Sequence, residues 1–168
     1  MEIKGYITNL GKYNEGILIG EWITFPIDDE ELEKVLERIG INDEYEEIFF
    51  TDWETEIGCG FGEYEDIESV NELAEQLEEI EMHDDLEKLE AIIEATGYGL
   101  EEAIDEMDNA IYWSGYTLEE VAQEIVDECY GGQKVDEIFF RYFDYEAFAR
   151  DLEFDGYTET TYGVICMS

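Results

Sequence analysis

The sequence predicts an α+β fold, built as an elongated chain of three small subdomains. Strand-like segments with many β-branched or aromatic residues lie near both ends of the chain, and segments with the apolar period of amphipathic helices lie between them. The 168 residues carry a formal net charge of −40, and an elongated shape lowers the repulsion among such charges. We expect an α+β subdomain at 1–58, an acidic helical subdomain at 59–107 and an α+β subdomain at 108–168.

The charge does not predict disorder, because the chain is also rich in apolar residues. It has 48 Asp and Glu against 8 Lys and Arg, yet 45% of it is hydrophobic, with 12 Tyr, 9 Phe and 3 Trp. This content supplies a core that can offset the entropy cost of folding. No apolar run approaches the roughly 20 residues of a membrane span, and the N-terminal residues lack the apolar stretch of a signal peptide. We therefore expect a folded cytoplasmic protein that does not bind membranes.

The first predicted subdomain contains three strands. Polarity alternates over 3–8, and 17–25 is rich in β-branched and aromatic residues, so these two segments predict a hairpin joined by a turn. The segment 46–54 (EEIFFTDWE) predicts a third strand. In this strand Ile48 and Phe50 can face a helix, because side chains alternate between the two faces of a sheet.

A helix is predicted between the second and third strands. Its apolar residues follow helical spacing: Leu32, Val35, Leu36 and Ile39. Asp28 or Asp29 can cap its start, and Gly40 can end it. The opposite face of this helix carries several carboxylates.

The central segment has the densest charge. Residues 55–108 contain 20 acids and a single base. An S-x-x-E capping box at Ser69 predicts the start of a first helix. A second helix is predicted to start at Asp84 or Asp85, and a third, shorter one covers 100–107. Each predicted helix has one apolar stripe and a broad carboxylate face.

The last third of the chain returns to mixed structure. A strand is predicted at 109–113, and a T-x-x-E capping box at Thr117 starts a helix whose inner face includes Cys129 and whose end is Gly131. A closing strand at 163–167 completes a second small sheet.

Six Phe and Tyr residues gather within 139–148. Two interpretations of this aromatic cluster stay open, a hydrophobic core and the interface of a homodimer. The residues assigned to the predicted interface are Phe139, Phe140, Tyr142, Phe143 and Tyr145.

The sequence offers no catalytic or cofactor-binding constellation. Cys59, Cys129 and Cys166 are odd in number and widely spaced, which argues against a disulfide framework and a zinc site. The only histidine, His83, is expected at the surface at the start of a helix. The glycines of 58–62 lack the spacing of a nucleotide-binding loop, and among 48 acids, pairs with catalytic spacing arise by chance. We therefore expect no enzyme activity, no cofactor and no metal ion.

The charge itself is the strongest functional signal. Duplex DNA carries one negative charge per about 1.7 Å of axis, so about 40 charges match roughly 20 base pairs. Direct nucleic-acid binding is not expected, because it requires basic groups. We predict that carboxylates on the outer faces of the helices imitate phosphates toward a protein that binds DNA. The predicted residues are Asp29, Glu30, Glu33, Glu37, Glu72, Glu75, Glu78, Glu79, Asp84, Asp85, Glu87, Glu90, Glu101, Glu102, Asp105 and Asp108.

Specific strings of the sequence resemble a known family. The segment YITNLGKYNEG at 6–16, continuing to GINDEYEEIFFTDWE at 40–54, resembles the N-terminal domain of the ArdA antirestriction proteins. The segment FDYEAFARDLEFDGY at 143–157 is similar to the C-terminal part of the same family. Between these segments the similarity is one of layout and acidity.

The resemblance implies a concrete function. ArdA proteins are encoded on mobile genetic elements and inhibit type I restriction-modification enzymes by mimicking bent B-form DNA. The resemblance therefore implies three small domains, a homodimer formed through the C-terminal domain, and occupation of the DNA groove of the specificity and methyltransferase subunits. It also places the antirestriction motif of the family near 124–130, where the residues alone predict an amphipathic helix.

Two other interpretations remain open from the sequence. The chain could mimic DNA toward a different DNA-binding protein, such as a CRISPR nuclease, a nucleoid protein or a repressor. It could also be an acidic interaction protein adapted to high salt, in which the charge serves hydration. The concentration of acids on the central helices favours mimicry over salt adaptation.

Overall fold

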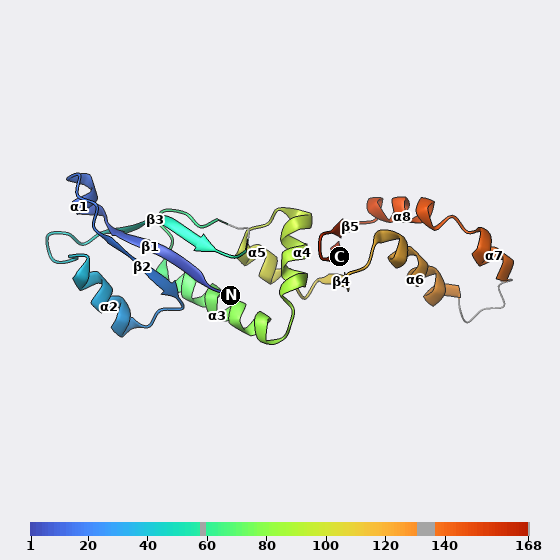
Figure 1. Ribbon diagram of the computed structural model, residues 1–168, viewed down its shortest axis with the longest axis horizontal. Helices are drawn as coiled ribbons and strands as arrows, with labels where there is room; N and C mark the ends of the chain where they lie inside the picture. The colour runs from blue at the N-terminus through green and yellow to red at the C-terminus, as the bar shows by residue number, and fades with distance from the viewer. Residues whose placement is uncertain (58–59, 131–136, 168) are drawn as a thin grey trace. The chain divides into compact units, whose positions relative to one another are not determined.

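The protein has a mixed α+β fold, as the sequence predicts. The computed structural model describes residues 1–57, 60–130 and 137–167 (Figure 1). The chain divides into two compact units, Met1–Asp84 and Asp85–Ser168, and each contains one three-stranded antiparallel sheet. The predicted central helices are shared between these units, and the division into three subdomains stays a prediction.

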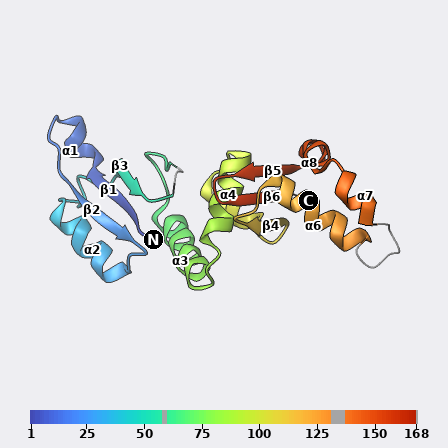
Figure 2. The same cartoon turned by 45° about the vertical axis from the view of Figure 1, so that its right-hand side comes forward.

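In its described residues the first unit consists of one sheet and the helices α1, α2 and α3, which Figure 2 labels. Its elements are β1 (Ile3–Asn9), α1 (Leu10–Asn14), β2 (Gly20–Phe25), α2 (Asp29–Arg38), β3 (Ile48–Thr55) and α3 (Ile67–Met82). The strand order is β2-β1-β3, and both pairs are antiparallel. The predicted hairpin and the predicted third strand are thereby confirmed.

One face of this sheet forms the core of the first unit. Ile3, Ile7 and Ile23 are buried, whereas the intervening residues Lys4 and Tyr6 are only half-buried. This alternation follows from the pleat of a strand, and it means that one face of the sheet is covered. Buried residues of α2 and α3 complete the core: Val35, Val70, Ala74 and Leu77.

The connection between β1 and β2 is a short helix, α1, where a simple turn was predicted. The buried side chain of Asn9 accepts a hydrogen bond from the backbone N–H of Lys12 at 2.9 Å, which caps α1. Its amide nitrogen donates to the carbonyls of Ile39 and Gly40 at 3.2 Å each. Asn9 therefore ties the first hairpin to the end of α2.

Helix α2 starts and ends where the sequence predicts. The Asp28 carboxylate accepts from the N–H of Glu31 at 2.8 Å, and Gly40 follows with a φ of +81°, a conformation that glycine adopts without strain. Phe50 is buried, as expected for a residue that faces the core, and the neighbouring Phe49, which points to the opposite face, is buried as well. The second face of the sheet is covered locally at Phe49, where the rings of Tyr13 and Tyr64 pack on it.

The start of α3 differs from its prediction. Asp66 is the N-cap, and its carboxylate accepts from the N–H of Ser69 at 3.0 Å and from its hydroxyl at 3.2 Å. The predicted capping box at Ser69 is therefore wrong, since Ser69 lies inside the first turn. His83 is exposed as predicted, but it lies at the end of α3, with its Nδ1 2.8 Å from the carbonyl oxygen of Glu79.

The second unit also surrounds a three-stranded sheet. Its elements are α4 (Leu86–Thr96), α5 (Leu100–Asp105), β4 (Ala110–Ser114), α6 (Leu118–Tyr130), α7 (Glu137–Tyr142), α8 (Tyr145–Phe154), β5 (Tyr157–Thr160) and β6 (Gly163–Met167). The strand order is β4-β6-β5. Strands β4 and β6 were predicted, whereas β5 was missed because its exposed polar residues show no apolar alternation.

Both faces of this second sheet are covered. The neighbouring residues Val164 and Ile165 on β6 are fully buried, although they point to opposite faces. Val164 packs with buried residues of α6 and α8, including Val121 and Leu152, and α4 contacts all three strands. The central strand therefore lies between α4 and the pair α6 and α8.

Helix α6 begins with the predicted capping box. The N–H of Thr117 donates to the Glu120 carboxylate at 2.8 Å, and the N–H of Glu120 approaches the Thr117 hydroxyl at 3.3 Å. The prediction that Cys129 faces inward is wrong: it is exposed, and Val126 is the last buried residue of the helix. The predicted end at Gly131 lies outside the described residues.

Candidate acidic interaction surface

The predicted phosphate-mimicking carboxylates lie on the solvent side of the helices. All of them are exposed except Glu90, which is half-buried. By element they are Asp29, Glu30, Glu33 and Glu37 on α2; Glu72, Glu75, Glu78 and Glu79 on α3; Asp84 and Asp85 between α3 and α4; Glu87 and Glu90 on α4; Glu101, Glu102 and Asp105 on α5; and Asp108 after α5.

The acidic face of α2 is partly neutralised by bases. Lys34 Nζ lies 2.8 Å from Glu30, and the Arg38 guanidinium lies 3.0 Å from Glu31. Arg38 also makes a two-point contact with Glu21 of β2, at 2.9 and 2.8 Å. These hydrogen bonds from Arg38 lower the pKa of Glu21, so Glu21 stays ionised as part of an ion pair.

The acidic face of α3 is different, because bases do not neutralise it. Glu81 pairs with the N-terminal ammonium of Met1. Across the described residues, the other α3 carboxylates have no ion-pair partner. The exposed members are Glu68, Glu72, Glu75, Glu78 and Glu79.

The spacing of these α3 carboxylates is close to that of phosphates. Glu68 and Glu79 are eleven residues apart, or about 16 Å at about 1.5 Å per residue. Five carboxylates over that length give about one charge every 4 Å, near the about 3.4 Å per phosphate of one DNA strand. We call these five residues the α3 stripe. Glu68 was missed at first because the helix was predicted to start after it.

Carboxylates on α4 are held in place by neutral donors. Glu87 accepts from the hydroxyl of Ser114 at 3.1 Å, and Glu94 accepts from the N–H and the hydroxyl of Thr161 at 3.1 and 3.2 Å. A hydrogen bond with Glu90 raises the pKa of Tyr162. These contacts orient the carboxylates without cancelling their charge. Glu94 was not among the predicted residues, although it lies one turn after Glu90 on the same helix.

The predicted dimer residues are divided between packed and exposed positions. The ring of Phe143 packs edge-on against Tyr145 and Phe148, with centroids 4.9 and 5.9 Å apart, so Phe143 is half-buried against aromatic side chains of α8. Phe140 is half-buried, Tyr142 is 80% exposed, and the side chain of Phe139 lies outside the described residues. The assignment of this region to a dimer interface stays a prediction.

The segment 124–130, where the resemblance places the antirestriction motif, is the second half of α6. Val126 is buried, whereas Asp127 and Glu128 are exposed. The second half of α6 is thus an amphipathic helix. One oxygen of Glu124 is buried, and within the described residues it has no hydrogen-bond partner.

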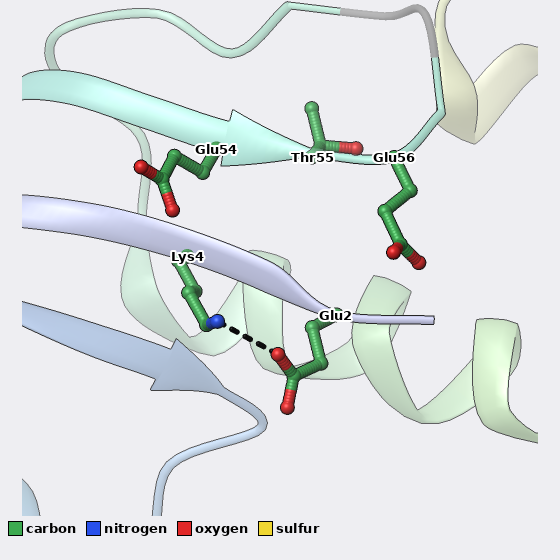
Figure 3. A pocket seen from close by; sticks show the side chains of 5 residues that line it. All are labelled: Glu2, Lys4, Glu54, Thr55 and Glu56. Carbon is green, nitrogen blue, oxygen red and sulfur yellow. Dashed lines mark ion pairs between the residues drawn. The ribbon is translucent and has the colours of Figure 1, made fainter.

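A shallow depression lies on the sheet of the first unit. Its volume is about 200 Å³, and Glu2, Lys4, Glu54, Thr55 and Glu56 line it (Figure 3). Lys4 Nζ lies 2.7 Å from Glu2, which raises the pKa of Lys4 and lowers that of Glu2.

Two kinds of feature are absent from the described residues, metal-binding clusters and membrane-spanning helices. Within the described residues, no three His, Cys, Asp or Glu side chains are arranged to hold a metal ion. None of the helices in the described ranges is both long enough and apolar enough to span a membrane.

Comparison with known proteins identifies the family. The sequence model of ArdA, described as antirestriction protein (ArdA), matches residues 5–166. The chain belongs to the ArdA antirestriction family. The match runs through both compact units, so the ArdA resemblance at the two ends of the chain extends across the acidic helices between them. The comparison with curated proteins gave no match.

Proposed function

We propose that this ArdA chain is a DNA mimic that inhibits type I restriction-modification enzymes in the cytoplasm. It occupies the DNA-binding groove of the specificity and methyltransferase subunits, and it performs no chemistry of its own. The observation that carries this proposal is the α3 stripe, whose carboxylates are exposed, unpaired with bases within the described residues, and spaced like phosphates.

Folded helices make such a surface effective. A helix fixes the positions of its carboxylates, whereas a disordered acidic segment loses conformational entropy when it is ordered on binding. The core of α3 supplies this rigidity through Val70, Ala74 and Leu77, which are buried. The hydrogen bonds to Glu87 and Glu94 orient the carboxylates of α4 in the same way.

The binding energy comes from many weak ionic contacts. The DNA groove of a restriction enzyme is lined with Lys and Arg, which meet phosphates in the natural complex. Carboxylates that meet the same groups release the ions around both surfaces, so affinity depends steeply on salt. The charge also speeds association by attracting a basic partner over a distance of several ångströms.

A homodimer would double the formal charge of the acidic surface from −40 per chain. Tyr142 and Phe154, on α7 and α8, are 80% and 88% exposed, and large exposed aromatic side chains often mark protein interfaces. We place the dimer interface in this part of the second unit. The doubled surface would match an extended, two-part DNA site.

The dimer can be tested by light scattering coupled to gel filtration. We expect Tyr142→Lys to convert a dimer into a monomer, because it places a charge in an apolar contact. Met82→Lys is a matched control, since Met82 is equally exposed in the first unit. A wild-type protein that elutes as a monomer at all concentrations would contradict the dimer.

The proposed inhibition is tested by competition in solution. A purified type I enzyme is bound to a fluorescent DNA carrying its target site, and the protein is added while the anisotropy is followed. We expect full displacement of the DNA. If six or more ionic contacts form, the affinity should fall about 1,000-fold between 50 and 200 mM salt. Failure to displace DNA from any of several type I enzymes at low salt would overturn the proposal.

A further inference from the structure

The sheet of the first unit has an open face that the acidic helices do not use. Residues directly opposite one another on neighbouring strands point to the same face. On β1, Tyr6 lies between Trp22 of β2 and Asp52 of β3. In the next row Lys4 lies between Thr24 and Glu54. Trp22, Thr24, Asp52 and Glu54 are all exposed.

Tyr6 and Trp22 form an aromatic pair on this face, and Gly20 fixes its position. A Cβ atom at Gly20 would lie 2.5 Å from the Tyr6 ring, so only glycine leaves room for that ring. The Tyr6 hydroxyl donates to the Gly20 carbonyl at 3.0 Å. Tyr6 in turn packs edge-on with Trp22, with centroids 5.4 Å apart and planes at 72°. Trp22 is thereby positioned although it is 40% exposed.

Trp22 differs from the other tryptophan of the same sheet. Trp53 packs against Phe50 and Phe61, and its indole N–H donates to the Gly62 carbonyl at 2.9 Å. In the described part of the chain, the indole N–H of Trp22 has no such acceptor. Trp22 therefore keeps both an exposed ring surface and a free donor for another molecule.

The other edge of this face is acidic. Figure 3 shows Glu2, Lys4, Glu54 and Glu56 directed to one side, with Thr55 directed away. The single base, Lys4, is already paired with Glu2. Asp52, Glu54 and Glu56 are exposed, and in the described residues no base pairs with them. The face thus combines an aromatic side on β2 with a surplus of negative charge on β3.

We propose that this open sheet face binds a basic segment of the partner by accepting an arginine side chain between Trp22 and Asp52. The proposal rests on the proposed function, because it assumes a partner whose surface is basic. Arginine fits better than lysine, since its planar guanidinium stacks on aromatic rings and also donates to carboxylates in a fixed geometry. A segment that lies over β1 would contact the aromatic side and the acidic side together.

This contact would add a component that phosphate mimicry lacks. Ionic contacts of the α3 stripe weaken with salt and accept any cation. Stacking on Trp22 depends less on salt and favours a guanidinium over an ammonium ion. The open face would therefore act as an anchor within a surface whose other contacts are interchangeable.

The anchor can be tested without a restriction enzyme. A six-residue arginine peptide and a six-residue lysine peptide are titrated into the ¹⁵N-labelled protein, and the indole N–H signal of Trp22 is followed by NMR, assigned with Trp22→Phe. We expect the arginine peptide to shift this signal together with the amides of Tyr6 and Asp52, and to bind about 10-fold more tightly than the lysine peptide. Shifts confined to α2 and α3 would overturn the proposal.

Variants separate the anchor from general acidity. Trp22→Ala should weaken arginine-peptide binding about 10-fold and lysine-peptide binding less, whereas Trp22→Phe should retain most of the preference. Tyr116→Ala is the matched control, because Tyr116 is also 40% exposed but lies in the second unit. Equal weakening by Trp22→Ala and Tyr116→Ala would contradict the proposal, and the dispersion of the amide spectrum shows that each variant is folded.

The same variants distinguish the anchor from the proposed function. If the wild type displaces DNA from a type I enzyme and Trp22→Ala does so equally well at 200 mM salt, the anchor is wrong and the mimicry stands. If the wild type fails to displace DNA but the arginine peptide still shifts the Trp22 signal, the anchor stands and the restriction enzyme is the wrong partner.

Discussion

Helices α2 and α3 look alike in sequence but present different surfaces. Both begin with an aspartate cap, and both carry acids on the outer face. On α2, Lys34 and Arg38 pair with Glu30, Glu31 and Glu21. On α3, the basic residues are absent, and the five carboxylates of the α3 stripe have no ion-pair partner in the described chain. The number of acids on a helix therefore does not give the charge that it offers to a partner.

The largest effect on DNA displacement is expected when the charges of the α3 stripe are removed. We expect the fourfold change Glu68→Gln, Glu72→Gln, Glu75→Gln and Glu79→Gln to weaken displacement of DNA from a type I enzyme by about 30-fold or more, if each exposed ionic contact contributes about 0.5–1 kcal/mol. The slope of the logarithm of affinity against the logarithm of salt concentration should also become shallower by about three. Anisotropy competition at several salt concentrations measures both.

The matched control is a fourfold change on α2: Asp29→Asn, Glu30→Gln, Glu33→Gln and Glu37→Gln. It removes the same number of charges, but Glu30 is already paired with Lys34, so its effect on displacement should be smaller. Equal effects of the two variants would show that total charge decides binding, and that the unpaired surface of α3 has no special role.

The same α3 variant should be more stable than the wild type. Glu68 and Glu72, and likewise Glu75 and Glu79, are four residues apart on one helix, and like charges at this spacing destabilise a helix by about 0.2–0.5 kcal/mol per pair. We expect a gain of about 0.5–1 kcal/mol in the free energy of unfolding. Weaker binding together with higher stability would indicate that the repulsion is kept for function.

The second expected effect concerns the two aspartate caps. Asp28→Ala and Asp66→Ala should each cost about 1 kcal/mol of stability, because each removes the acceptor of a backbone N–H in the first turn. Only Asp66→Ala should also weaken binding, since it loosens the helix that carries the α3 stripe. Urea denaturation and the anisotropy competition measure the two effects.

Ser69→Ala is the control for the Asp66 cap. A larger loss of stability from Ser69→Ala than from Asp66→Ala would restore the capping box predicted from the sequence.

Much of the fold could be predicted from the sequence because helix periods and caps are local signals. Thr117 and Glu120 gave the start of α6 correctly, and Gly40, which has a positive φ, marked the end of α2. Asp66 was missed because Ser69, three residues later, also matches the sequence pattern of a helix cap. Strand β5 was missed because none of its four residues is buried, and pairing with β6 is what makes it a strand.

The site was less predictable than the fold, because charge pairing depends on contacts between distant residues. The sequence shows that Glu21 and Arg38 are both charged, but not that they meet across 17 positions. The hydroxyl groups of Ser114 and Thr161, which orient Glu87 and Glu94, are likewise distant in sequence. The exposure of the carboxylates could be predicted, because the helical spacing of the apolar residues shows which side of each helix faces solvent. Fifteen of the sixteen predicted carboxylates are exposed.

The smallest expected effect comes from removing the base that neutralises α2. Arg38→Met breaks the contacts with Glu21 and Glu31, and because these groups are exposed, the melting temperature should fall by only about 1–2 °C at pH 7. Arg38 lowers the pKa of folded Glu21 below its ordinary value of 4.5. Its contribution to stability is therefore present above pH 4.5 and is lost as the pH falls through the folded pKa. The melting temperatures of wild type and variant should thus converge below that pH, whereas a difference that persists in acid would indicate that Arg38 stabilises α2 by packing.

The variant also leaves α2 with fewer paired acids, so it should bind a type I enzyme slightly better than the wild type if unpaired charge is what the partner recognises.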